Sequence, residues 1–346
     1  MELTIVGDTD QKDWDAIVER SSNATLFHTW KWLKLMEKDP TVQSGRTGSG
    51  ATFHPICLME KDSPVCIYPL FFVKKFLFNF TYSPIPNREI LYLGPLFPDL
   101  EAMKEEKKQI LFIDVQKQID RYIKKDLNSA YIQLSTPPGF EDCRSFKWAG
   151  YTVIPRYSYE IDLNKGKESI WNAFPRRLKS DINHVKKKGF SVVIGTRKDI
   201  EFIYDILKER NRINADKKYI LEIFDNFSPQ NLKVFILKYE NKNISGIVFI
   251  SYKKKGWLWI GNPRSSCRGT SPNYLLFWEI INHAIDSGFE KIEIMGADDY
   301  SSFPFKRRFN GKIIPYYQMK WLSPSFNVVS SLYDSLIKGD NNQIDV

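Results

Sequence analysis

Cationic residues gather in two parts of the sequence, and their type and spacing suit the binding of phosphate groups. Segment 175–218 holds 13 Lys or Arg against 6 Asp or Glu. Segment 300–320 holds five cations and no acid, namely Lys306, Arg307, Arg308, Lys312 and Lys320. A localised basic surface attracts polyanions such as the phosphates of a nucleotide, of a lipid carrier or of RNA. A solvated helix face that only keeps the protein in solution is the alternative interpretation.

The cations of the first segment divide into two kinds. Lys186–Lys188 precede Gly189, where positive charge suits the negative end of a helix dipole, so these lysines have a structural explanation. Arg176, Arg177 and Lys179 lie near Pro175 at the break of a predicted helix over 168–188, where capping does not explain them. Charged side chains of this type bind phosphate strongly, so we expect these three residues to hold an anion.

Other kinds of site have no support in the sequence. The four cysteines and four histidines are dispersed without a CxxC pair or metal-ligand spacing, so we expect no metal and buried free thiols. No Gly-x-Ser-x-Gly motif is present, so hydrolase-type covalent catalysis is not indicated. Homeodomain, zinc-finger and RNP signatures are also missing, and we expect no DNA partner.

Length and composition indicate a globular protein of about two domains. The chain has 346 residues, of which 42% are hydrophobic and 14% aromatic. No run of about 18 uncharged apolar residues occurs, and residues 1–8 lack the features of a signal peptide. We therefore expect a soluble protein of the cell interior.

The two halves of the sequence follow one plan of strand, helix, β-meander, helix and strand. The first half closes with a predicted helix over 101–125 and a strand over 130–134, and the second with a helix over 272–287 and a strand over 291–295. This order predicts a duplicated α/β domain. We place the domains at 1–150 and 151–322, with a helix and frayed tail over 323–346.

An aromatic segment, 66–82, is interrupted only by Lys74 and Lys75. A core strand that runs into a hairpin is the favoured interpretation. A surface that rests on a membrane or holds a lipid tail is the alternative.

Several motifs, in order along almost the whole chain, resemble those of the FemABX-like proteins. Phe27–Trp32 resembles their N-terminal F-x-x-x-x-W motif, and segments 92–96 and 186–192 are also similar to them. Phe305–Gly311 is similar to the F-K-x-x-F-G-G motif near their C-terminus, with Asn310 in place of a glycine.

The resemblance implies an α/β protein with two tandem GNAT-like domains, each a mixed central sheet flanked by helices. Members that build peptidoglycan bridges move an amino acid from aminoacyl-tRNA onto the amine of a muropeptide precursor, and others are thought to use acyl-CoA. It thus implies an acyl- or aminoacyltransferase that forms an amide on a cell-envelope precursor or similar anionic acceptor, either a small molecule or lipid-linked. Aminoacyl-tRNA or acyl-CoA would be the co-substrate, with no tightly bound cofactor. A cytoplasmic enzyme is implied, with contact at the inner face of the membrane left open.

The resemblance also assigns roles to the cationic residues. Lys306 would stabilise the tetrahedral oxyanion of acyl transfer or bind a donor phosphate, and Asp298, Asp299 or Tyr300 would assist. Arg307 and Arg308 would continue the donor site. Arg176, Arg177 and Lys179 would hold acceptor phosphates, which requires a groove from Lys306 to this trio.

The expected CoA-binding loop departs from the usual GNAT pattern. Before the helix at Pro272 the glycine spacing differs from Gln/Arg-x-x-Gly-x-Gly/Ala, and Arg268, Gly269 and Asn273 are the candidate cofactor-binding residues. Two alternatives therefore stay open. One is an acyl-CoA-dependent N-acetyltransferase, and the other is a non-catalytic tandem GNAT protein that binds a polyanion such as tRNA.

Overall fold

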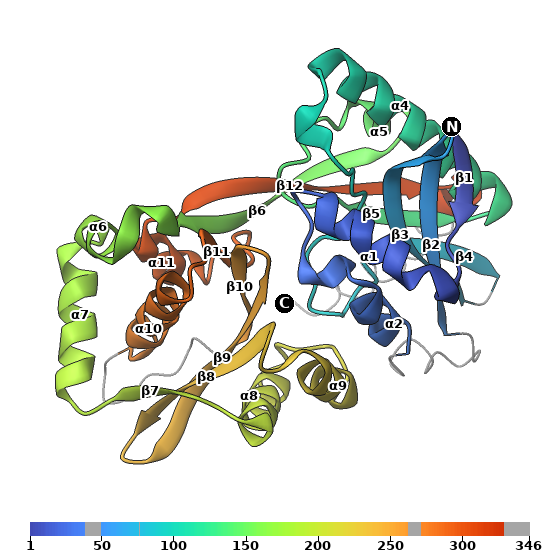
Figure 1. Ribbon diagram of the computed structural model, residues 1–346. Helices are drawn as coiled ribbons and strands as arrows, with labels where there is room; N and C mark the ends of the chain where they lie inside the picture. Colours follow the sequence, from blue (N-terminus) through green and yellow to red (C-terminus); the bar gives the residue numbers. More distant parts are fainter. Residues whose placement is uncertain (39–49, 76, 262–270, 329–346) are drawn as a thin grey trace, which may run out of the picture.

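A computed structural model describes residues 1–38, 50–75, 77–261 and 271–328. The chain forms two lobes, one from each half of the sequence, and two long strands run from one lobe to the other (Figure 1). Within the described residues, no helix has both the length and the apolar character that spanning a bilayer requires.

The strands of the described residues form one twelve-stranded sheet in the order β1-β2-β3-β4-β5-β12-β6-β11-β10-β9-β8-β7. The first half supplies β1 (Glu2–Ile5), β2 (Ala51–Glu60), β3 (Ser63–Lys75), β4 (Phe78–Ser83) and β5 (Tyr131–Ser135). The second half supplies β7 (Ser191–Ile194), β8 (Leu232–Tyr239), β9 (Lys242–Tyr252), β10 (Lys255–Gly261) and β11 (Lys291–Ile294). The central strands are β6 (Thr152–Asp162) and β12 (Lys312–Leu322).

The two halves repeat one strand pattern. In each, an antiparallel meander leads to a single parallel pair, which is β4 with β5 in the first half and β10 with β11 in the second. A parallel pair needs a crossover connection, and the helices α4 (Glu105–Arg121) and α10 (Asn273–Asp286) supply it. The prediction of an α/β fold built from two similar halves is confirmed, although the sheet is continuous rather than divided in two.

Strands β6 and β12 connect the two halves of the sheet, because the last strand of the chain pairs with a strand of the first half. β12 comes last in the chain, yet its residues Gln318–Leu322 pair with β5 of the first half. β6 pairs with β12 along most of its length and with β11 through Tyr159–Asp162. The sequence analysis predicted no strand over 312–322. Only two side chains of β12 are fully buried, so it lacks the apolar alternation that marks a half-buried strand.

Helices cover both faces of the sheet. Two pairs lie between the lobes: α1 (Gln11–Arg20) and α2 (Trp30–Lys38), with α8 (Arg197–Glu209) and α9 (Lys217–Phe227). The outer face of the first half carries α4 (Glu105–Arg121) and α5 (Arg144–Trp148). The outer face of the second half carries α6 (Gly166–Ala173), α7 (Arg176–Lys187) and α10 (Asn273–Asp286), with the short α11 (Phe303–Lys306) near the central strands.

One hydrophobic core is common to both halves. Trp32 of α2 is fully buried, and its ring centroid lies 5.1 Å from those of Phe227 and Trp259. The same core includes Trp14 of α1 and Ile203 of α8. Burying such aromatic side chains contributes about 1.5–3 kcal/mol each, so the two lobes stabilise one another.

A buried ionic network reinforces the junction between the lobes. Glu293 of β11 has no exposed surface and accepts hydrogen bonds from Tyr92 of the first half at 2.8 Å and from Ser158 of β6 at 2.7 Å. Lys255 lies 2.8 Å from Glu293 and 2.9 Å from Glu160. Burial alone would lower the pKa of Lys255, but the attraction of the two carboxylates outweighs it and the pKa is raised.

The cysteines confirm one sequence prediction where they are described. Cys57, Cys66 and Cys143 are free thiols in buried positions, and Cys267 lies outside the described residues.

Candidate active site

The candidate site begins where strands β10 and β11 part. They pair in parallel only from Lys255 and Lys291 to Leu258 and Ile294, and a β-bulge in β10 follows at once. Beyond this point β10 continues along β9 and the chain after β11 turns away. The backbone thus opens between two neighbouring strands, and an opening of this kind can admit an extended ligand.

Lys306, on α11, reaches the end of β11. Its Nζ atom donates to the carbonyl of Met295 at 2.6 Å and also to the carbonyl of Gly296. The residue is half-buried, and burial lowers the pKa of Lys306 to about 8, against weaker opposing effects of Asp299 and Asp298. An ammonium group has three N–H donors, so one is left for a ligand when the lysine is protonated.

A cavity of about 680 Å³ lies beside Lys306 at the junction of the two halves. Its walls come from the first half through Leu91, from the end of α8 and the link to α9, from the ends of β10 and β11, and from β12. The lining residues are Leu91, Leu207, Arg210, Arg212, Gly261, Gly296, Asp298, Asp299, Ser302, Lys306 and Tyr316. A volume in this range is typical of small-molecule sites.

The cavity carries both signs of charge. Asp298 accepts from the backbone N–H of Tyr157 at 3.4 Å. Asp299 accepts from the backbone N–H of Ser301 at 2.9 Å, and Arg212 lies 3.9 Å from its carboxylate. Carboxylates beside Lys306 and arginines on the facing wall can therefore hold a ligand that carries both an amine and an anionic group.

A smaller cavity of about 300 Å³ adjoins the first and shares Leu91 and Gly296 with it. Glu89 forms part of its wall, and its Oε1 atom accepts from the backbone N–H groups of Asn214 at 3.1 Å and Ala215 at 3.4 Å. Trp259 donates to the carbonyl of Glu89 at 2.7 Å. These contacts fix the first-half loop against the second half, so both halves build the site.

The equivalent opening in the first half is filled by the chain itself. Beyond the parallel pair of β4 and β5, the N–H of Leu93 donates to the carbonyl of Ser135 at 3.0 Å. Gly94 has a φ of +53°, and a Cβ there would lie 2.9 Å from Ser135 O and Thr136 Cα. Backbone in such close contact leaves no space for a substrate at this point, so within the described residues the opening beyond the parallel pair is kept in the second half and closed in the first.

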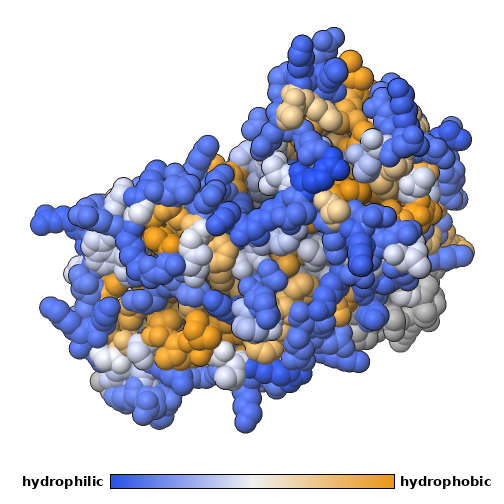
Figure 2. Space-filling model, viewed as in Figure 1, coloured by the Kyte–Doolittle hydropathy of each residue, from blue (hydrophilic) through white to orange (hydrophobic). Residues whose placement is uncertain are grey.

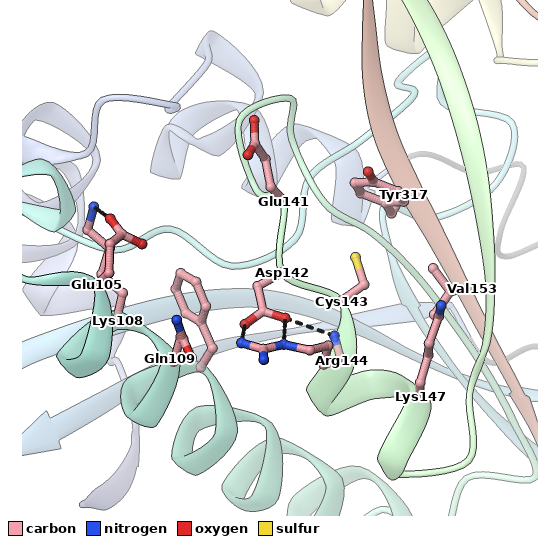
Figure 3. A pocket seen from close by; sticks show the side chains of 11 residues that line it. Glu105, Lys108, Gln109, Glu141, Asp142, Cys143, Arg144, Lys147, Val153 and Tyr317 are labelled. Carbon is pink, nitrogen blue, oxygen red and sulfur yellow. Dashed lines mark hydrogen bonds and ion pairs between the residues drawn. The ribbon is translucent and has the colours of Figure 1, made fainter.

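The first half has a different cavity, of about 480 Å³, on its outer face between α4, α5 and β12 (Figure 3). Lys108 is paired with Glu105 at 2.6 Å and Arg144 with Asp142 at 2.8 Å. Burial raises the pKa of the Cys143 thiol to about 12, so this sulfur is not a nucleophile at neutral pH. Paired charges and an inactive thiol give this cavity no evident chemistry.

The predicted catalytic residues have separate positions. Lys306 and Asp299 line the main cavity. Tyr300 does not: its side chain is 84% exposed and its ring stacks on Phe303. A phenol in open solvent is poorly placed to assist at Lys306.

The predicted donor residues surround the first turn of α10. The guanidinium of Arg308 lies 5.2 Å from the ring centre of Tyr274 and forms an ion pair with Asp181 of α7 at 3.2 Å. Burial raises the pKa of Tyr274, and the nearby charges of Arg308, Arg177 and Arg307 oppose that rise. The charges of Arg177, Arg307 and Arg308 thus lie near Tyr274 on the outer face of the second half, and Arg307 directly follows Lys306 in the chain.

The cavity beside Lys306 does not extend to the α7 cations. Arg176, Arg177 and Lys179 lie on or beside the outer helix α7, and none of them lines the cavity. Arg268 and Gly269 lie outside the described residues. The side chain of Asn273 is fully buried and accepts from Ser245 at 2.6 Å, so it supports α10 rather than facing a ligand.

Sequence reasoning missed the cations that do line the cavity. Arg210 and Arg212 contributed to the basic count of segment 175–218, but no motif separated them from their neighbours. Leu91 and Tyr316 were also missed, because only the exchange of β6 and β12 brings the halves together here. Among the described residues, no group of three His, Cys, Asp or Glu converges as metal ligands would.

Comparison with known proteins agrees with this geometry. Residues 176–307 match the family described as an acetyltransferase (GNAT) domain. A search of curated proteins finds no match. The crystal structure of FemX superposes with a TM-score of 0.69 at 14% identity, covering 95% of this chain and all of that one.

Two further solved structures share the fold. The C-terminal domain of a putative lysylphosphatidylglycerol synthetase from Agrobacterium fabrum has a TM-score of 0.54 at 14% identity, covering 95% of this chain and 96% of that one. A tandem GNAT protein from the clavulanic acid biosynthesis pathway has a TM-score of 0.51 at 8% identity, covering 93% of this chain and 98% of that one. Residues 176–307 of this chain thus match a GNAT acetyltransferase domain, and the chain as a whole has the fold of these solved structures, one of them a tandem GNAT protein.

Proposed function

We propose that this acyltransferase moves an acyl or aminoacyl group from a phosphate-bearing donor to an amine of an anionic acceptor held between the two halves. The main support is the cavity at Lys306, which brings a half-buried ammonium group, two carboxylates and two arginines together. A substrate that carries both an amine and an anionic group is held best by a pocket with charges of both signs.

The charged groups of the cavity suggest a separate role for each in the reaction. Arg210 and Arg212 would hold the anionic part of the acceptor, and Asp298 or Asp299 would take the proton that its amine must lose. The amine nitrogen then bonds to the donor carbonyl carbon, and the carbonyl oxygen becomes an oxyanion. The free N–H of Lys306 would stabilise that oxyanion. When the intermediate collapses, the bond from carbon to the donor oxygen or sulfur breaks, and the leaving group takes up a proton.

The donor would lie on the outer face of the second half. Arg177, Arg307 and Arg308 gather around the first turn of α10, and the exposed cations of α7 extend this basic surface. A phosphate chain bound there could pass its reactive end through the opening between β10 and β11. An aminoacyl-tRNA fits the long basic surface.

An acyl-CoA donor is the second candidate. The match of residues 176–307 to an acetyltransferase domain and the parting of β10 from β11 favour it. The acceptor would be an anionic small molecule or a lipid-linked molecule. The fold shared with the putative lysylphosphatidylglycerol synthetase is compatible with a lipid-linked acceptor.

A thermal-shift comparison separates these donors. The protein is mixed with acetyl-CoA, with total aminoacylated tRNA or with UDP-linked amino-sugar precursors, each at low and high salt. Stabilisation by charged tRNA that is lost at high salt, with none from acetyl-CoA, supports aminoacyl transfer. Stabilisation by acetyl-CoA supports the second candidate.

A transfer assay then tests catalysis itself. Mass spectrometry follows amide formation on amino-sugar precursors, with Lys306→Ala beside Lys312→Ala, which removes an exposed lysine outside the cavity. Binding of tRNA without transfer to any acceptor would favour the non-catalytic alternative.

A further inference from the structure

The hairpin between β3 and β4 ends in an apolar tip flanked by lysines. Residues 72–82 contain five aromatic residues, Leu77 and two charged residues, Lys74 and Lys75, with no acid. Leu77 is 93% exposed, and the side chains of both lysines are exposed as well. Leu77 and the partly exposed Phe78 beside it gather apolar surface at one place, and exposed apolar surface that is gathered in a patch can mark a protein or membrane interaction site.

Aromatic rings from neighbouring segments pack against one another beside the tip. The ring of Phe326, from the segment after β12, lies 4.9 Å from Phe78 and 5.6 Å from Phe80 in edge-to-face contacts. Tyr131 of β5 adds a fourth ring, 6.1 Å from Phe326. Val328, two residues beyond Phe326, is 61% exposed and extends the apolar surface. The described residues 323–328 carry no charge.

The backbone of the hairpin is suited to an apolar medium. Pairing between β3 and β4 continues to Lys75 and Phe78, immediately beside the turn. Peptide groups that are already hydrogen-bonded cost little to remove from water, whereas unpaired ones cost several kcal/mol each. Partial burial of this tip in a lipid interface would therefore leave few polar groups without partners.

We infer that this tip, defined by Lys74, Lys75, Leu77 and Phe78 with Phe326 and Val328 beside it, docks onto the surface of an anionic lipid bilayer. The leucine would enter the boundary between headgroups and acyl chains, and the lysines would lie among the phosphates. This combination of an apolar insertion with adjacent cations is what peripheral membrane binding requires. The proposal is independent of which donor or acceptor the enzyme uses.

Vesicle sedimentation tests this surface with the full chain. Vesicles of phosphatidylcholine alone are compared with vesicles containing phosphatidylglycerol, at low and high salt. We expect binding to the anionic vesicles that weakens as salt rises. Leu77→Ser should reduce the partition coefficient about tenfold, since it removes the inserted side chain. Lys74→Glu with Lys75→Glu should reduce it at least as much.

A matched control removes an exposed apolar side chain elsewhere. Ile194 is 55% exposed at the end of the edge strand β7, so Ile194→Ser should leave vesicle binding unchanged. All three variants alter exposed side chains, and circular dichroism should show wild-type folding. Failure of the wild-type protein to bind anionic vesicles at low salt would overturn the proposal. An equal loss of vesicle binding in Leu77→Ser and Ile194→Ser would also overturn the proposal. Vesicle binding that is abolished only by charge reversal of Lys186 and Lys187 on α7 would overturn it too.

Discussion

The hydroxyl group of Tyr92 donates a 2.8 Å hydrogen bond to the carboxylate of Glu293, and this bond ties the two halves of the chain together. Tyr92 belongs to the first-half loop that lines the site, and Glu293 lies on β11, just before the residues that Lys306 binds. The ring of Tyr92 also packs edge-on against Tyr316, with centroids 5.4 Å apart. The walls of the cavity therefore depend on a buried polar network outside it.

Removing the Glu293 carboxylate should destabilise the whole chain. Glu293→Ala leaves Lys255 buried with Glu160 as its remaining close acid, and breaking such a pair costs about 3–5 kcal/mol. Urea unfolding should report this loss. Glu290→Ala is the control, because Glu290 is exposed and directly precedes β11. It should change the free energy of unfolding by less than about 0.5 kcal/mol. A Glu293 variant as stable as the control would show that the network contributes no net stability.

Much of the fold could be predicted from the sequence because the repeated pattern is local. Turn residues, helical spacing and capping identified the meanders and the closing helices of both halves. The exchange of β6 and β12 is not local, since it is set by which sheet edge each strand meets after folding. A half-exposed strand such as β12 carries too little apolar periodicity to reveal it.

The candidate site was predicted only in part, for a related reason. Lys306 was found through a motif of neighbouring residues. Arg210, Arg212 and Leu91 come from distant segments, and no spacing along the chain connects them with Lys306. Tyr300 was chosen because it is near Lys306 in sequence, but the short turn before α11 directs it into solvent.

Lys306→Ala should leave the protein folded and lower turnover about 100-fold, the size of effect expected when an oxyanion donor is lost. Both hydrogen bonds from Nζ to the carbonyls of Met295 and Gly296 are also lost, so a change in local order would accompany it. Steady-state rates of amide formation measure the effect, with Lys312→Ala at the wild-type rate. Normal turnover in a folded Lys306→Ala variant would remove this lysine from the mechanism.

The pH dependence of the rate should reveal the charge on Lys306. Burial lowers the pKa of Lys306 to about 8, so its ammonium form is complete well below pH 8 and is lost as the pH rises through that value. Turnover should fall correspondingly on the alkaline side. In Lys306→Arg the cation persists at every accessible pH, and whatever activity remains should lack this alkaline decline. If wild type and variant decline together, the titrating group is a different one.

Arg212 offers a test of acceptor binding. Its side chain is half exposed and faces Asp299 across the cavity wall at 3.9 Å. If it holds the anionic part of the acceptor, Arg212→Ala should raise the acceptor KM about tenfold and change kcat by no more than about twofold. Lys198→Ala removes an exposed cation from α8 outside the cavity and should alter neither constant. A fall in kcat alone would instead point to a role in the chemical step.

Gly94 tests whether the first half is closed for a structural reason. A Cβ at this position would lie 2.9 Å from backbone atoms of Ser135 and Thr136, on a residue whose φ is already +53°. Gly94→Ala should therefore lower the free energy of unfolding by more than the strain of a positive φ alone, which is about 1–3 kcal/mol.

Gly139→Ala provides the matched comparison for Gly94→Ala. Gly139 also has a positive φ, +94°, but its added Cβ would have no heavy atom within 4 Å. The difference between the two variants in urea unfolding then isolates the contact of Gly94 with the β5 end. Equal losses would mean that the first-half opening can relax around a side chain. In that case tight backbone packing would not be what keeps substrate out of the first half.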